Sequence, residues 1–230
     1  MSASASDLSL PPPFSLVTLR EIGDALRHAI AIAPDAGAGT LVWARRFDLA
    51  EFAVVLEPEE PLRLARRAVY AGANALADTL SALAPPERAI AWDWPDAVRV
   101  DGALVGGVRL AWPDGDEDDV PDWIVFAAMV RTVVMQAGEP GLRPLLGGLD
   151  EEGFEELSPS AVIEDWARYF LREMDSWNEF GFDAARARWL ARGAGEAPRI
   201  LDTGDAGSRS LAAALKQPSW LDPATGVPWI

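Results

Sequence analysis

Hydrophobic and polar positions recur along this chain with two different periods, which predict a mixture of helices and strands. Residues 19–33 carry apolar side chains at helical spacing, so we expect a helix there. Residues 40–46 and 51–57 are short apolar runs on either side of a turn and predict a β-hairpin. From Pro61 to Leu83 apolar residues recur every three or four positions, which predicts a long helix with one buried face.

A second hairpin is predicted around Asp101-Gly102, because both central residues of a type I′ turn must accept a positive φ. Alternation along the returning strand puts Leu104 and Gly106 on one face and Gly107 on the other. Two adjacent glycines remove side chains from both faces at one level of the strand. A ligand, another strand or a bulge must therefore approach the backbone there.

The second half of the chain predicts one more strand and further helices. Residues 123–135 form a long apolar run that predicts a buried strand, with Arg131 as its lone charge. Ser158-Pro159 is a typical helix start, and Gly181 should end that helix. Asp183 is a candidate cap for a second short helix that ends near Arg192. Hairpins combined with amphipathic helices favour an α+β fold. We expect one domain over residues 1–194 and a small turn-rich appendage over 195–230.

Composition excludes several classes of function. The net charge of −16 opposes binding to nucleic acid and to anionic membranes. No run approaches the roughly 20 apolar residues that span a bilayer, and the first residues lack a signal-peptide pattern, so we expect a soluble cytoplasmic protein. The absence of cysteine excludes disulfides, thiolate zinc sites and cysteine nucleophiles. We assign no metal site and no catalytic residue.

Two motifs carry a resemblance to a known family. The segments DWPDA at 93–97 and LVGG at 104–107 resemble the Lys-Trp-Pro-Asn-Asp motif and the following lysine-and-glycine hairpin of the biotin and lipoate A/B protein ligases. Residues 160–192 are similar to the helical segment of that family, and the resemblance covers about residues 17–192. Within this family, the chain most resembles a little-characterised bacterial branch with a divergent active site. The segments that carry this resemblance include GTLVWARRFD, EFAVVLEPEEPL and PSWLDPATG.

The resemblance implies a fold and an activity. The fold is a mixed, mainly antiparallel sheet with helices packed on it, as in class II aminoacyl-tRNA synthetases and biotin ligases. The activity is the activation of a small carboxylic acid, such as biotin, lipoate or a medium-chain acid, with ATP and Mg²⁺. A biotinyl or lipoyl carrier domain, whose lysine receives the acyl group, is the implied partner. Such catalysis rests on positioning and on neutralising phosphate charge.

The sequence departs from the family motif at its cationic positions. The motif lysine is replaced by Asp93, the second lysine by Leu104 and the final aspartate by Ala97, and Lys216 is the only lysine in the chain. A unit charge about 4 Å from a phosphate contributes roughly 4 kcal/mol at an effective dielectric of about 20, so replacing lysine by aspartate changes the interaction by about 8 kcal/mol. Arginines must compensate if the chain activates an acid.

Arginine, glycine and motif residues are the candidates for binding the acid. Guanidinium groups suit carboxylate and phosphate, and bare backbone beneath the motif makes room for a guest. The predicted substrate-binding residues are Arg45, Arg46, Trp94, Pro95, Asp96, Gly106, Gly107, Arg109 and Arg131.

Each candidate also has a structural interpretation. Arg109 and Arg131 could form structural ion pairs, and adjacent Arg45 and Arg46 should point to opposite faces. Trp94 could be a wall of the acid pocket or ordinary core. Aspartates of the motif could hold magnesium, receive an arginine or cap the hairpin end.

Three hypotheses follow from these observations. The chain is a ligase in which arginines replace the lysines, a ligase-fold protein that binds a small acid or a partner without turnover, or an interaction protein that uses its acidic surface and C-terminal appendage. The resemblance favours the first two. The oligomeric state stays open, because the long apolar strand could be central or could pair across a two-fold axis.

Overall fold

The computed structural model of the chain describes residues 8–135, 146–155, 157–193, 210–224 and 228–229. These residues build one seven-stranded sheet in the order β1-β2-β3-β7-β6-β5-β4. Its strands are β1 (Ser15–Leu19), β2 (Thr40–Ala44), β3 (Leu49–Leu56), β4 (Ile90–Asp93), β5 (Ala97–Val100), β6 (Ala103–Ala111) and β7 (Ile124–Arg131). β1 runs parallel to β2 and the other neighbouring strands are antiparallel, so the mixed, mainly antiparallel sheet is confirmed.

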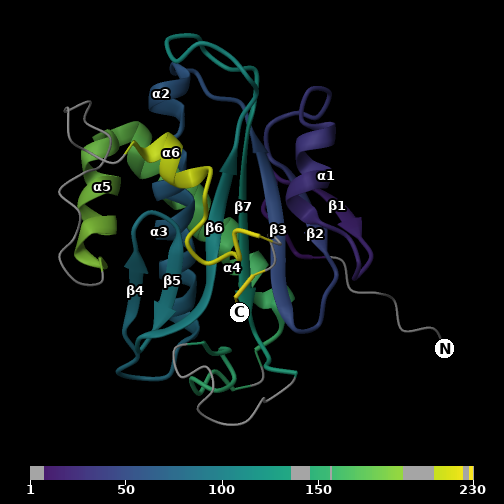
Figure 1. Cartoon of the computed structure of the whole chain (residues 1–230), viewed down its shortest axis with the longest axis vertical. Helices are drawn as coiled ribbons and strands as arrows, with labels where there is room; N and C mark the ends of the chain where they lie inside the picture. Colours follow the sequence, from purple (N-terminus) through teal and green to yellow (C-terminus); the bar gives the residue numbers. More distant parts are fainter. Residues whose placement is uncertain (1–7, 136–145, 156, 194–209, 225–227, 230) are drawn as a thin grey trace.

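Helices cover both faces of this sheet. They are α1 (Ala25–Ile32), α2 (Leu62–Ala65), α3 (Ala68–Leu83), α4 (Pro159–Phe180), α5 (Phe182–Ala191) and α6 (Leu211–Leu215). In Figure 1, α1 and the yellow C-terminal segment lie in front of the sheet, and α4 lies behind it. The helices α3, α4 and α5 pack on one another and on the rear face, where the larger hydrophobic core lies.

The rear core is held together by an unusually close approach of α3 to the sheet. A Cβ on Gly72 of α3 would lie 2.1 Å from the ring of Phe126 on β7, so only glycine fits there. Trp166 of α4 stacks on Phe126 with ring centroids 5.3 Å apart, and its indole N–H donates to the carbonyl of Gly72 at 3.0 Å. This contact sets the distance between the two helices and the sheet.

The first predicted helix is wrong in its extent. Residues 15–19 form β1, whose parallel pairing with β2 supplies backbone partners from a distant part of the chain. The helix α1 starts only after Asp24, whose carboxylate accepts the backbone N–H of Arg27 at 2.8 Å. The predicted helix 61–83 is likewise divided, with a break at Arg66-Arg67 between α2 and α3.

The predicted hairpin at Asp101-Gly102 is confirmed, with φ of 47° and 92°. The predicted alternation along β6 is wrong at its start. The pairing skips Val105, because Val98 faces Gly106 while Arg99 faces Leu104. This bulge turns Val105 into the rear core and places Leu104 on the front face, the same face as Gly107.

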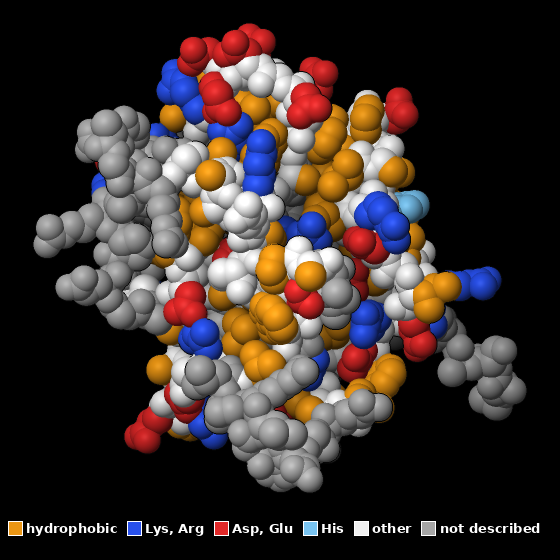
Figure 2. Space-filling model, viewed as in Figure 1, with side chains coloured by type: hydrophobic (Ala, Val, Ile, Leu, Met, Phe, Trp, Pro, Cys, Tyr) orange, Lys and Arg blue, Asp and Glu red, His pale blue; other side chains and the backbone are white. Residues whose placement is uncertain are grey.

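Charged residues are unevenly spread over the front of the molecule. Figure 2 shows acidic side chains at the top, over the loop that follows β6. There Glu117 pairs with Arg66 and Asp118 pairs with Arg63, so the acidic loop is tied to α2. In the described part of the chain, no helix is both long and apolar enough to cross a membrane.

The C-terminal segment (residues 210–224 and 228–229) is packed on the same sheet. Leu211 and Leu215 of α6 join the larger core, while Trp220 and Leu221 pack on the front face. The predicted boundary at residue 194 lies outside the described residues and stays a prediction.

Candidate functional site

A hollow of about 280 Å³ opens on the front face of the sheet. Its floor is formed by β3, β6 and β7, and its sides by the first turn of α1 and by the C-terminal segment. The charged side chains along it are those of Asp24, Arg46, Glu51 and Arg109. Pockets for drug-sized ligands have volumes of roughly 300–1,000 Å³, so this hollow suits one small molecule.

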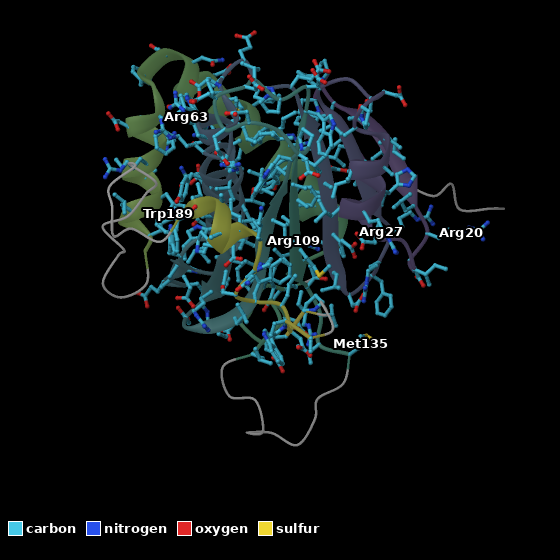
Figure 3. The ribbon with its side chains drawn as sticks, turned by 45° about the horizontal axis from the view of Figure 1, so that its top comes forward. Arg20, Arg27, Arg63, Arg109, Met135 and Trp189 are labelled. Carbon is cyan, nitrogen blue, oxygen red and sulfur yellow. The ribbon has the colours of Figure 1, made fainter. Side chains whose placement is uncertain are left out.

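Arg109 differs from Arg46, the other arginine of the hollow, in its lack of an ion pair among the described residues. It lies on β6, is half-buried and makes no hydrogen bond or ion pair within 4.0 Å among the described residues. Burial lowers the pKa of its guanidinium, while the negative fields of Asp24 and Glu51 oppose that shift. An arginine remains charged despite such a shift. Figure 3 shows Arg109 in the middle of the molecule, between the C-terminal segment and α1. The hollow therefore offers a partly desolvated donor fork that suits a carboxylate.

Arg46 and Glu51 form a second charged group on the other side of the hollow. Glu51 of β3 is buried and accepts the backbone N–H of Ala25 at 3.0 Å, at the first turn of α1. Arg46 contacts Glu51 at 3.9 Å and is held at 3.2 Å by Asp48. Burial raises the pKa of Glu51, and the bond from Ala25 and the charge of Arg46 oppose the rise. Unlike Arg109, Arg46 already has its carboxylate partners.

Protein atoms occupy the space next to both glycines of β6. A Cβ on Gly106 would lie 2.1 Å from the carbonyl oxygen of Met129 on the neighbouring strand. A Cβ on Gly107 would lie 2.2 Å from Nε1 of Trp220. The indole of Trp220 is buried, and its N–H donates to the carbonyl of Val108 at 3.2 Å. The space that the sequence predicted for a guest at this level of β6 thus holds a strand and a tryptophan of the same chain.

Asp96 anchors the segment that carries this tryptophan. Its buried carboxylate accepts the backbone N–H of Ser219 at 3.0 Å and the hydroxyl of Ser219 at 2.7 Å. Burial raises the pKa of Asp96 from the usual 3.8 to about 6, although the bonds from Ser219 act in the opposite direction. The motif aspartate therefore binds the chain's own C-terminal segment.

The remaining predicted residues lie away from the hollow. Trp94 is on the rear side, where its indole N–H donates to the hydroxyl of Tyr70 at 3.1 Å. Pro95 is buried between β4 and β5. Arg45 is exposed, and Arg131 lies at the end of β7 with its side chain next to Gly148. None of these four is among the residues that line the hollow.

The position of the family's motif lysine carries a paired aspartate. Asp93 accepts from Nε of Arg99 at 2.6 Å, and both side chains are partly exposed. Arg99 also donates to the carbonyl of Gly102 at 2.8 Å. Within the described ranges no group of three or more acidic or histidine side chains is arranged to hold a metal ion.

Of the residues that line the hollow, sequence reasoning found only Arg46 and Arg109, and it missed Asp24, Glu51 and Trp220 among others. Asp24 and Glu51 were overlooked because nothing in a single strand or loop pattern relates them to Arg109 on β6. Trp220 was assigned to the appendage, yet it lines the hollow. The glycine at 107 was the signal for it, since a missing side chain in a strand requires something to pack against the backbone.

Comparison with known proteins assigns the chain to a protein family. Residues 10–191 match the biotin/lipoate A/B protein ligase family. Over 162 residues the chain is 30% identical to a biotin–[acetyl-CoA-carboxylase] ligase of Paracoccus denitrificans. This aligned stretch makes up 69% of this chain and 66% of that ligase's length. The chain therefore spans just under two thirds of that relative.

Solved structures share the fold. A biotin protein ligase-like protein of unknown function from Silicibacter sp. is 28% identical, with a TM-score of 0.75 over 88% of this chain and 87% of its own. The biotin protein ligase of Aquifex aeolicus is 16% identical, with a TM-score of 0.62 over 79% and 78%. The same enzyme in complex with biotin and ATP has a TM-score of 0.61 at 14% identity, over 77% and 78%. At these identities the Aquifex structures show the fold alone.

Proposed function

Because the chain belongs to the biotin/lipoate A/B protein ligase family, we propose that it binds a small carboxylic acid in the hollow, with Arg109 as the partner of the carboxylate. The observation that carries this proposal is a half-buried guanidinium that has no ion pair among the described residues. Partial burial of a cation with no ion pair among the described residues costs free energy, and a carboxylate that accepts two of its N–H groups offsets that cost.

The family reaction defines the proposed substrates and products. A carboxylate oxygen of biotin, lipoate or a medium-chain acid attacks the α-phosphorus of ATP, and pyrophosphate leaves. A lysine amine of a carrier domain then attacks the acyl carbon of the adenylate, and AMP leaves. The Aquifex relative that was solved with biotin and ATP supports this proposal through its fold.

The hollow fits the acid better than it fits the nucleotide. Its volume of about 280 Å³ accommodates one small molecule, so ATP would lie outside it or displace the C-terminal segment. Arg46, the other cation there, is already paired with Asp48. We assign no magnesium ligands, because the described residues contain no suitable carboxylate cluster.

A second candidate function is acid binding without turnover. The ion pair between Asp93 and Arg99 favours it, since it puts a carboxylate where the family motif has its lysine and uses a nearby arginine to neutralise that carboxylate. Positive charge at that position is then not available to a phosphate.

Two measurements separate these candidates. Calorimetric titration with biotin, lipoate and octanoate should detect binding of at least one acid, and Arg109→Gln should weaken it about 10- to 100-fold, as expected for loss of a charge-assisted hydrogen bond. The matched control Arg99→Gln removes an arginine outside the hollow and should leave the affinity unchanged. Exchange of labelled pyrophosphate into ATP, dependent on the acid that binds, would identify a ligase.

The possible outcomes are distinct. Binding with exchange supports the ligase, and binding without exchange supports the second candidate. If the wild-type protein binds no acid, or if Arg109→Gln binds as tightly as wild type, the assignment of the hollow fails and the interaction-protein hypothesis gains.

A further inference from the structure

Part of the hollow comes from outside the family match. The matched residues end at 191, whereas Trp220, Leu221 and Pro228 of the C-terminal segment line one side of the hollow. We propose that Trp220 is a specificity-determining residue, whose indole sets the greatest length of acid that the hollow accepts. This inference rests on the proposed function, since it describes the guest that Arg109 would hold.

The register of β6 places Trp220 close to the proposed carboxylate position. Gly107 and Arg109 are two residues apart and face the same side of the sheet, so their Cα atoms are separated by about 7 Å. The indole lies directly on Gly107, because a Cβ there would overlap its pyrrole ring at 2.2–2.4 Å. An acid that binds Arg109 and extends along β6 towards Gly107 therefore meets the indole after a short acyl chain.

Several bonds hold the indole in this position. The indole N–H donates to the backbone carbonyl of Val108. The backbone carbonyl of Trp220 accepts the backbone N–H of Trp229 at 2.9 Å. The preceding residue, Ser219, donates twice to the buried carboxylate of Asp96. A side chain fixed by its neighbours on both sides acts as a wall and does not yield to the guest as a loose side chain would.

On the side of α1, the hollow is bordered by residues of the smaller core. Leu26 of α1 and Ala127 of β7 lie on that side, and both are buried in the smaller core between α1 and the sheet. An acid cannot extend in that direction without separating α1 from the strands. Among the small acids proposed above, the hollow should therefore select by the length of the acyl chain between Arg109 and Trp220.

Chain-length profiling of the full-length protein tests this wall. Calorimetry with straight-chain carboxylates from four to twelve carbons should show the wild-type affinity rising about fourfold per added methylene and then falling sharply once the chain reaches the indole. Trp220→Leu keeps an apolar side chain over Gly107 but shortens it, so the rise should continue by two or more carbons. Trp220→Ala should move the limit further.

Controls distinguish a wall from a general loss of packing. Trp189→Leu removes another fully buried tryptophan, which packs against Tyr70 on the rear side, and should leave the length limit unchanged. Circular dichroism establishes that each variant is folded.

Failure of this inference differs from failure of the proposed function. If the wild-type protein binds none of these acids and neither biotin nor lipoate, the proposed function is refuted. If it binds biotin or lipoate but no straight-chain acid, the proposed function stands and the length limit set by Trp220 is refuted. If it binds straight-chain acids and folded Trp220→Leu keeps the same length limit, or loses all acid binding, then Trp220 is not the residue that sets the length.

Discussion

Gly107→Ala tests the packing of the C-terminal segment on the sheet. Glycine at this position has no positive φ, so the backbone itself accepts alanine, and alanine in a strand is ordinarily better than glycine by about 0.5–1 kcal/mol. The new Cβ would nevertheless lie 2.2 Å from Nε1 of Trp220, far inside the ~3.5 Å of an ordinary contact. The indole must therefore retreat by about 1 Å.

That retreat has a definite energetic cost. The N–H of Trp220 is already 3.2 Å from the carbonyl of Val108, so a further displacement breaks this bond, at about 1 kcal/mol. Overpacking a buried site costs another 1–3 kcal/mol or so. After subtracting the backbone gain, we expect Gly107→Ala to lower the free energy of unfolding by about 1–3 kcal/mol.

A double-mutant cycle isolates the contact. Trp220→Ala alone should cost about 3–5 kcal/mol, because it removes a fully buried tryptophan. In that background Gly107→Ala no longer meets a ring and should be neutral or stabilising by up to about 1 kcal/mol. Urea denaturation of the four proteins gives a coupling energy, which we expect to be about 2–3 kcal/mol. Gly37→Ala, where a Cβ would meet nothing within 4 Å, is the matched control and should change stability little.

The cycle can refute the packing directly. If Gly107→Ala costs the same whether residue 220 is tryptophan or alanine, the indole does not lie on this glycine in solution. The hollow would then lack the side that the C-terminal segment provides.

Three further outcomes follow from other parts of the fold. Asp96 has a folded-state pKa of about 6 against the usual 3.8, so its contribution to stability is complete below pH ~4 and is lost as the pH rises through 6. In urea titrations, the free energy of unfolding of wild type minus that of Asp96→Asn should therefore fall by about 3 kcal/mol between pH 4 and 8. A difference that does not change with pH would contradict the burial of this carboxyl group. Arg99→Ala breaks a partly exposed ion pair with Asp93 and should lower the free energy of unfolding, measured by urea denaturation, by less than about 1 kcal/mol. A larger loss would show that the pair is structural. Gly72→Ala pushes a Cβ into the ring of Phe126 and should lower the melting temperature by several degrees through a loss of about 1–3 kcal/mol, and an unchanged melting temperature would refute the close approach of α3.

Local rules predicted the parts of the fold that depend on neighbouring residues. The Asp101-Gly102 turn was predictable because its two positive φ angles are a property of the dipeptide. The strand β1 was missed because its only described sheet partner, β2, begins 21 residues after the last residue of β1. The bulge at Val105 was missed for a related reason, since strict alternation assumes that no residue is skipped in the pairing.

The candidate site was predictable only in part. Alternation placed Arg109 and Gly107 on one face of β6, and in the structure Arg109 lines the hollow while Gly107 lies under Trp220, which also lines it. The sequence pattern does not say which face of the sheet Trp94 occupies, and it lies on the rear side. The partner of Gly107 is 113 residues further along the chain, a separation that no pattern within a strand reveals.

The insertion of Trp220 from beyond the family match has an evolutionary consequence. The C-terminal segment lies outside the seven strands, so its substitutions leave the backbone pairing of the sheet intact, but a change at Trp220 alters the packing on Gly107 and therefore affects folding. A related chain that changes its selectivity at this position must therefore keep a side chain that fills the space over Gly107.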